Sequence, residues 1–203
     1  MNGMPTDTMM ALAGLLMVMT WTPGPNNAML AASGANYGLR RTIPHILGVA
    51  LGFPLMLFCV AMGLGEVYAR APILAELLRW AGAALLIWVA WKIYKTSAPG
   101  SDNAKARPFT FLQAAGFQWI NPKAWAMTVG LVAQFVTGQN RLTEAMICGG
   151  ISVMVGLASS LSWASVGVVV QRILATPQRL HLFNTVMAVM ILCCISFLFL
   201  DRV

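Results

Sequence analysis

The sequence predicts an all-α membrane protein whose six transmembrane helices form two inverted halves of three. Three features lead to this prediction: 59% of the 203 residues are hydrophobic and only 9% are charged, the apolar residues fall into six long runs, and two of these runs contain proline motifs at matching places. Soluble domains carry about 25% charged residues, so a soluble fold would leave much of this apolar surface in water. We expect a single transmembrane domain over residues 1–203, with no separate soluble domain.

The six apolar runs predict the membrane-spanning segments, because a spanning helix needs roughly 20 apolar residues. They lie near residues 8–33, 43–65, 72–94, 110–136, 144–169 and 182–200. The extended polar stretch at about 95–109 predicts a cytoplasmic hinge loop between a first half of about 1–95 and a second half of about 110–203. No Lys or Arg precedes Arg40, so the sequence does not predict a cleavable signal peptide.

Basic residues are unevenly distributed between the two sets of loops. The positive-inside rule places the more basic loops in the cytoplasm, so we expect both termini in the periplasm. The net charge of +7 then reflects orientation in the membrane, and we expect no nucleic-acid partner. The first, third and fifth gaps hold Arg40, Arg41, Lys92, Lys95, Lys105, Arg107, Arg172 and Arg179, whereas the opposite side holds Arg70, Arg79, Arg141 and Arg202.

Three spans per half make the second half enter the membrane from the opposite face. Pro23 lies about 15 residues into the first run and Pro122 about 12 residues into the fourth. Trp21 and Trp119 precede them at similar distances. This correspondence predicts an inverted repeat, the internal symmetry of many secondary transporters.

The motifs Thr22-Pro23-Gly24-Pro25-Asn26 and Asn121-Pro122-Lys123 predict two breaks inside spanning helices. Proline removes a backbone donor and restricts the residue before it, and such breaks are tolerated in a membrane only against protein or water. Thr22-Pro23 and Asn121-Pro122 each fit an N-cap followed by proline at the first helical position. We therefore expect two half-helices that begin near the bilayer midplane and favour an anion; a simple kink at each proline is the alternative.

Lys123 is the ionisable residue that lies well inside a predicted span. Burying a lysine there costs several kcal/mol unless the charge is paired or hydrated, which makes it a functional candidate. The sequence leaves three partners open: a substrate carboxylate, carbonyl groups freed by the breaks, or water reached along the side chain. The acidic residues lie near ends or gaps: Asp7, Glu66, Glu76, Asp102, Glu144 and Asp201.

The cysteines and histidines carry no predicted chemistry. Cys59, Cys148, Cys193 and Cys194 lie inside apolar runs without a CxxC or metal-ligand spacing, so we interpret them as packing residues. His45 lies near a cytoplasmic gap and is interpreted as an ordinary interfacial histidine. We expect no cofactor, no metal and no catalytic residue.

Three segments resemble the LysE/RhtB family of amino-acid exporters across essentially the whole chain. They are TPGPNN in the first run, WAGAALLIWVAWKIYK in the third and QWINPKAW in the fourth. The third-run segment and the doubled asparagine are similar to the cysteine/O-acetylserine exporter branch. The resemblance implies six spans in the bacterial inner membrane, export of small amino acids and coupling to the proton gradient. Many members carry aspartate where this chain has Asn26, which removes an obvious proton-carrying carboxylate.

These observations predict a secondary transporter that exports a small amino acid or derivative by alternating access. The sequence leaves the exported amino acid, the coupling ion and the oligomeric state open; a homo-oligomer is one alternative. A thiol-redox conduit would require cysteines beside Pro23 and Pro122, and a membrane-embedded enzyme would require a Ser/His pair, an Asp pair or a metal cluster. The predicted substrate-binding residues are Thr22, Pro23, Gly24, Pro25, Asn26, Asn27, Asn121, Pro122 and Lys123.

Overall fold

The computed structural model describes residues 4–95, 107–138, 140–173 and 176–196, and the regular structure within these ranges is entirely helical. This confirms the predicted all-α class. Most of the predicted hinge loop and the end of the sixth apolar run lie outside the described residues. The elements are α1 (Thr6–Trp21), α2 (Pro25–Cys59), the π-helix η1 (Val60–Leu64), α3 (Gly65–Arg70), α4 (Pro72–Tyr94), α5 (Phe111–Gln118), α6 (Pro122–Phe135), α7 (Arg141–Ile173) and α8 (Pro177–Ser196).

Four helical stretches of the described chain are long and apolar enough to cross a membrane. They are Pro25–Arg70, Glu76–Tyr94, Arg141–Ile173 and Pro177–Ile195. The first of them joins α2, η1 and α3 and is 46 residues long, about 69 Å at 1.5 Å per residue if straight. That length exceeds twice the hydrocarbon thickness of roughly 30 Å, so a single straight crossing does not describe it.

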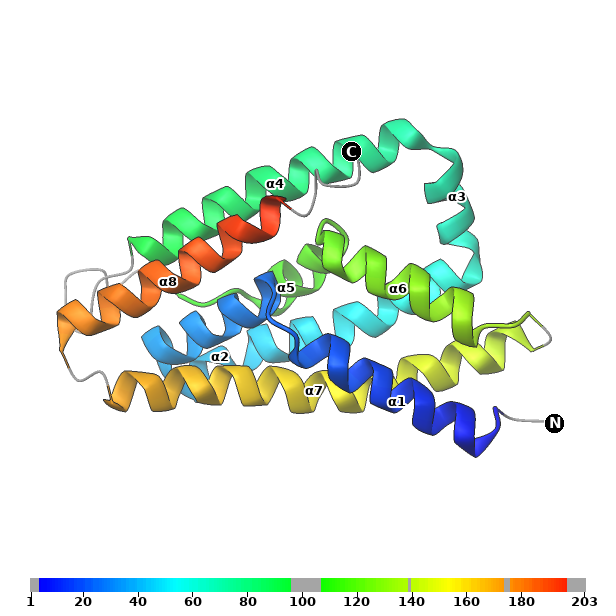
Figure 1. Ribbon diagram of the computed structural model, residues 1–203, viewed down its shortest axis with the longest axis horizontal. Coiled ribbons are helices and arrows are strands. Elements are labelled where there is room, and N and C mark those ends of the chain that lie inside the picture. The colour runs from blue at the N-terminus through cyan, green and yellow to red at the C-terminus, as the bar shows by residue number, and fades with distance from the viewer. Residues whose placement is uncertain (1–3, 96–106, 139, 174–175, 197–203) are drawn as a thin grey trace.

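Gly38 divides α2 into two segments. Its φ of 76° and ψ of 164° are non-helical, a conformation that glycine adopts because it has no Cβ. Figure 1 shows the blue part of α2 running to the left and the cyan part returning to the right. The gap expected between the first two apolar runs is therefore reduced to this residue, since helix continues on both sides of it.

The long helices pack through small residues. A Cβ atom at Gly34 of α2 would overlap the carbonyl oxygen of Ala164 in α7, and one at Gly167 of α7 would overlap that of Ala31 in α2. At Gly52 a Cβ atom would lie 2.7 Å from the Cα atom of Ala115 in α5. These contacts let the backbones of α2, α5 and α7 approach closely, as small residues do in membrane helices.

The ends of the helices alternate between two sides of the molecule. In Figure 1 the C-terminal ends of α4 and α7 lie at the left, together with the N-terminal end of α8, whereas α3 and the N-terminal ends of α1, α4 and α7 lie at the right. At the left end the ammonium of Lys95 lies 4.3 Å from the ring centre of Trp91, and that of Lys92 lies 5.2 Å from the ring centre of Trp88. This combination of aromatic and basic residues is typical of a membrane interface.

Candidate functional site

The first break separates α1 from α2 at residues 22–24. Thr22 closes α1, because its N–H and its hydroxyl both donate to the carbonyl oxygen of Val18, at 3.1 and 2.6 Å. Gly24 has extended backbone and is the N-cap of α2, and Pro25 occupies the first turn. Thr22 was predicted to be the N-cap of the helix that follows the first break, and this prediction is wrong because Gly24 is that N-cap. With two prolines in sequence the helix restarts at the second one, and the threonine hydroxyl is already used by the preceding helix.

The second break separates α5 from α6. Asn121 is the N-cap of α6, its side-chain oxygen accepts from the N–H of Lys123 at 3.1 Å, and Pro122 stands in the first turn. This confirms the cap predicted from Asn121-Pro122. The indole N–H of Trp125 donates to the carbonyl oxygen of Trp119 at 2.7 Å, which fixes the non-helical residues against α6.

The two breaks, about 100 residues apart in sequence, meet at Lys123. Its ammonium donates to the carbonyl oxygens of Thr22, at 2.5 Å, and Pro23, at 3.5 Å. Of the partners that the sequence left open, the freed carbonyl groups are the ones seen in this structure. The negative end of the α1 dipole lies at the same place and further stabilises a cation.

Side chains from three other helices satisfy the carbonyl groups at the end of α1. The amide of Asn27 in α2 donates to the carbonyl oxygens of Thr20 and Thr22, each at 2.9 Å. The hydroxyl of Ser159 in α7 donates to that of Thr20 at 3.0 Å. Together with Lys123 in α6, they replace the backbone donors that a continuous helix would supply.

A pair of amide side chains links the start of α2 to the end of α5. Asn26 donates to Gln118 at 2.9 Å, and Gln118 donates back at 3.4 Å. Gln118 has no solvent-exposed surface and also donates to the carbonyl oxygen of Ala114 at 2.8 Å. Asn26, Asn27 and Asn121 are thus all brought to the breaks, each with a different local partner.

Gly24 leaves the space in which the Lys123 side chain reaches the carbonyl oxygens of Thr22 and Pro23. A Cβ atom at Gly24 would lie 2.9 Å from the Cδ atom of Lys123 and 3.1 Å from its Nζ atom. The φ of −175° at Gly24 is open to any residue, so the glycine is required for space and not for backbone freedom.

Two cavities adjoin the breaks, and Gly24 and Lys123 line both. The first, which we call the polar cavity, has a volume of about 60 Å³. The second, which we call the α4/α6 cavity, has a volume of about 590 Å³, within the range of small-molecule sites. The polar cavity is lined by residues that include Asn26, Asn27, Gln118, Asn121, Ser152, Ser159 and Ser160. The α4/α6 cavity is lined by residues that include Thr22, Pro23, Pro25, Arg79, Pro122, Trp125 and Cys194.

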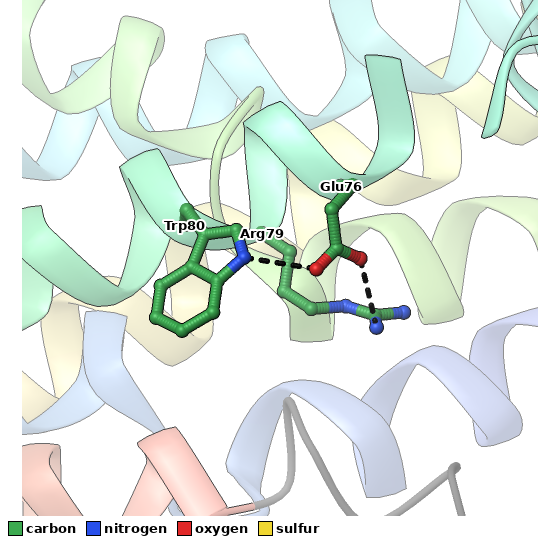
Figure 2. Close-up of polar contacts among 3 residues, drawn as sticks. All are labelled: Glu76, Arg79 and Trp80. Atoms are coloured by element: carbon green, nitrogen blue, oxygen red, sulfur yellow. Dashed lines mark hydrogen bonds and ion pairs between the residues drawn. The ribbon is translucent and has the colours of Figure 1, made fainter. Parts of the chain in front are cut away.

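Arg79 brings a second cation to the α4/α6 cavity. Its guanidinium lies 3.4 Å from the carboxylate of Glu76, one turn earlier in α4. The other oxygen of that carboxylate accepts from the indole N–H of Trp80 at 2.8 Å, so the three side chains form one cluster (Figure 2). With Lys123 at one wall and Arg79 at another, the cavity suits a ligand that carries a carboxylate.

All nine residues predicted to bind substrate lie at these two breaks. The unpredicted residues that line the cavities include Gln118, Ser159, Arg79 and Cys194. Gln118 and Ser159 carry a local signal, as polar residues within apolar runs. Arg79 and Cys194 carry none, because only the packing of α4 and α8 brings them to the cavity. His45, which we interpreted as an interfacial histidine, is 1% exposed, because it lies in the packed part of α2 that follows Gly38.

Helices apolar enough to cross a membrane, interrupted at two points around an interior site, define a class: polytopic membrane transporters. Residues 17–201 match the family model described as LysE type translocator. The chain belongs to this family. It is 31% identical over 182 residues to the cysteine/O-acetylserine efflux proteins of Escherichia coli strain K12, Escherichia coli O139:H28 and Shigella flexneri, in alignments that cover 88% of this chain and 90% of each relative. No solved structure matches.

These findings confirm the resemblance that the sequence motifs carry. The chain is a translocator and not an enzyme, and the relatives that bear the efflux name share nearly the whole of its length. The redox conduit and the membrane-embedded enzyme are therefore set aside.

Proposed function

We propose that this protein exports a small amino acid or amino-acid derivative across the bacterial inner membrane, with Lys123 at the centre of the binding site. The observation that carries the proposal is the bond from Lys123 to the carbonyl groups of Thr22 and Pro23, between two cavities. Cysteine and O-acetylserine are the first candidate substrates, since the relatives' names specify them.

The contacts of Lys123 support an exchange of partners when a zwitterionic amino acid binds. The substrate carboxylate pairs with Lys123 and with the N–H groups at the starts of α2 and α6, which have no partner within their helices. The substrate ammonium takes the place of Lys123 at the carbonyl oxygens of Thr22 and Pro23. Each charged group in the site then keeps hydrogen-bond partners, which a buried charge requires.

The remaining predicted residues have two roles: they keep the helices interrupted, and they supply polar groups around the substrate. Pro23 and Pro25 keep the first break open, and Pro122 does so at the second. Asn26, Asn27 and Asn121 line the polar cavity and offer amide groups to the substrate.

Alternating access across a 3+3 inverted repeat is the proposed transport cycle. Both halves have the same order of elements: a helix, a break, a second helix, a long helix and a last helix. Residues 6–37, 39–70 and 72–94 would form three crossings in the first half, and residues 111–135, 141–173 and 177–196 three in the second. Rocking of one half against the other would open the site first to the polar cavity and then to the α4/α6 cavity, driven by the proton gradient.

The proposed orientation has both termini in the periplasm. Support comes from the basic residues of the first, third and fifth gaps and from the aromatic and basic residues at the end of α4. The α4/α6 cavity would then belong to the periplasmic half of the protein.

Export from proteoliposomes loaded with labelled O-acetylserine or cysteine tests the proposal. Lys123→Ala and Asn26→Ala should each lower the initial rate by at least about tenfold, because removing a charge-assisted hydrogen bond costs roughly 1.5–3 kcal/mol. Lys95→Ala is the matched control, a lysine at the helix end that touches neither cavity, and should export at the normal rate. Unchanged export by both site variants would show that the site lies elsewhere.

A further inference from the structure

A third cavity lies beside the middle of α2, around Gly38 and away from the breaks. It has a volume of about 40 Å³ and is lined by α2, α4 and the segment that leads into α5. We call it the α2/α4 cavity. A single water molecule needs roughly 10–15 Å³ on this scale, so the space accommodates a group the size of a carboxylate. Its polar lining residues include Ser33, Asn36, His45, Lys92 and Arg107.

His45 lines this cavity with an unsatisfied ring nitrogen. Its Nδ1 atom lies 3.0 Å from the hydroxyl of Ser33, whereas its Nε2 atom has no hydrogen-bond partner among the described residues. The ring is 1% exposed and lies 5.5 Å from the ring of Phe109. A buried nitrogen left unpaired costs roughly 1–3 kcal/mol, so the geometry calls for a ligand or water in the cavity.

The charges around the cavity select the kind of ligand. Lys92 and Arg107 both line it, and none of the described lining residues is an Asp or Glu. The ammonium of Lys92 lies 6.0 Å from the ring centre of Phe109, which places it beside the ring that also contacts His45. Two cations and an imidazole nitrogen are the donors that bind a carboxylate.

The position of the cavity relates it to the site at the breaks. Ser33 and Asn36 lie on the same segment of α2 as Asn26 and Asn27, about 10 Å further along the helix at 1.5 Å per residue. The same segment therefore lines both cavities, one near each of its ends.

We propose that the α2/α4 cavity is a loading site, where His45, Lys92 and Arg107 bind the carboxylate of the amino acid before it reaches Lys123. The nature of the ligand rests on the proposed function, whereas the binding of a carboxylate to these three residues does not. The ligand leaves this site when its carboxylate exchanges the three donors for Lys123 and the helix N-termini.

Nitrogen NMR of the full chain in nanodiscs observes this site directly. The chain has two histidines, His45 and His181, so ¹⁵N-histidine labelling gives two sets of ring signals, and His181→Gln assigns them. Acetate serves as the minimal carboxylate probe and O-acetylserine as the amino-acid probe. Both should shift the His45 signals saturably while the His181 signals stay in place.

Variants then separate this site from the one at the breaks. Arg107→Gln removes an exposed cation of the cavity and should weaken the binding of acetate by about tenfold. Lys95→Gln, a cation at the same end that does not line the cavity, should leave it unchanged. Lys123→Ala should lower export by at least about tenfold and keep the His45 shift.

Three results would overturn the loading site: no saturable shift of the His45 signals, equal binding by the Arg107→Gln and Lys95→Gln variants, or loss of the shift in Lys123→Ala. A fourth is displacement of the probe when phosphatidylglycerol replaces phosphatidylcholine in the nanodiscs, which would assign the cavity to a lipid headgroup. An acetate shift without export by the unsubstituted protein would retain the cavity site and refute the proposed function.

Discussion

Lys123 is held by two carbonyl oxygens that have no helical donor, and its path to them runs past Gly24. The site therefore depends on a residue without a side chain as much as on the charged one. The proline motif supplies both requirements, since Pro23 and Pro25 free the carbonyl groups and the glycine between them leaves the space.

Gly24→Ala should displace the Lys123 side chain without removing its charge. The extended backbone accepts alanine, but the added methyl group would lie 2.9 Å from the Cδ atom of Lys123, so the flexible side chain has to move. We expect the export rate to fall about tenfold, because the displaced ammonium loses a charge-assisted hydrogen bond. The unfolding temperature should change little, because a flexible side chain and no backbone has to move. Export by proteoliposomes and thermal unfolding in detergent measure the two effects.

Gly14→Ala is the control for this substitution. It lies in α1, where a Cβ atom would meet nothing within 4 Å, and alanine in a helix is slightly stabilising. Normal export by Gly24→Ala would contradict the role assigned to the Lys123 contacts.

Residues near a break were more readily predicted than residues brought to it by packing. Asn121, Pro122 and Lys123 form a local motif, so their cap geometry follows from the sequence. Thr22 was misassigned because the motif offers two prolines, and local rules do not decide which one restarts the helix. Arg79 could not be predicted, since its role depends on where α4 packs.

At the scale of the helices, α2 and α7 form the main packed pair, and their contact relies on glycine. Gly167 in α7 faces the backbone of Ala31 in α2, where a Cβ atom would overlap the carbonyl oxygen. The overlap involves backbone and no flexible side chain, so relief requires the helices to separate.

Gly167→Ala should therefore destabilise the fold by about 1–3 kcal/mol, the usual cost of overpacking. Gly149→Ala lies in the same helix where a Cβ atom would meet nothing within 4 Å, and it should be neutral or slightly stabilising. Thermal unfolding of both variants in one detergent compares them. Equal unfolding temperatures would mean that α2 and α7 are further apart than the structure has them.

The six apolar runs located the helices but not their continuity. The first gap was expected to be a polar loop, yet helix continues up to and beyond Gly38, because one glycine with positive φ is enough to reverse the chain. The fourth run was expected as one broken span, and the described chain has helices of 8 and 14 residues there. Hydropathy reports where the chain is apolar, whereas turns depend on single residues.

At the scale of the whole molecule, labelling of Cys194 tests from which side of the membrane the α4/α6 cavity is accessible. This thiol of α8 lines the cavity together with Lys123, whereas its neighbour Cys193 is exposed on the outside of the bundle. In a variant that retains only Cys194, an anionic membrane-impermeant methanethiosulfonate added to spheroplasts should label the thiol. O-acetylserine should slow the reaction about threefold when it occupies about two thirds of the sites.

A variant that retains only Cys193 is the matched control. Its thiol lies on the surface that we expect to face lipid, so the water-soluble reagent should react slowly and O-acetylserine should have no effect. Labelling of Cys194 in inside-out vesicles but not in spheroplasts would reverse the proposed orientation while leaving the site in place.

The bond between Lys123 and the end of α1 bears on which cations can bind at this place. Carbonyl oxygens gathered at the negative end of a helix are also the ligands that sodium and potassium ions seek. The ammonium of Lys123 already binds these oxygens, so it competes with an inorganic cation for them. Under the proposed exchange, Lys123 would take the place of the substrate's amino group whenever no substrate is bound. The protein would then not leak inorganic cations across an energised membrane.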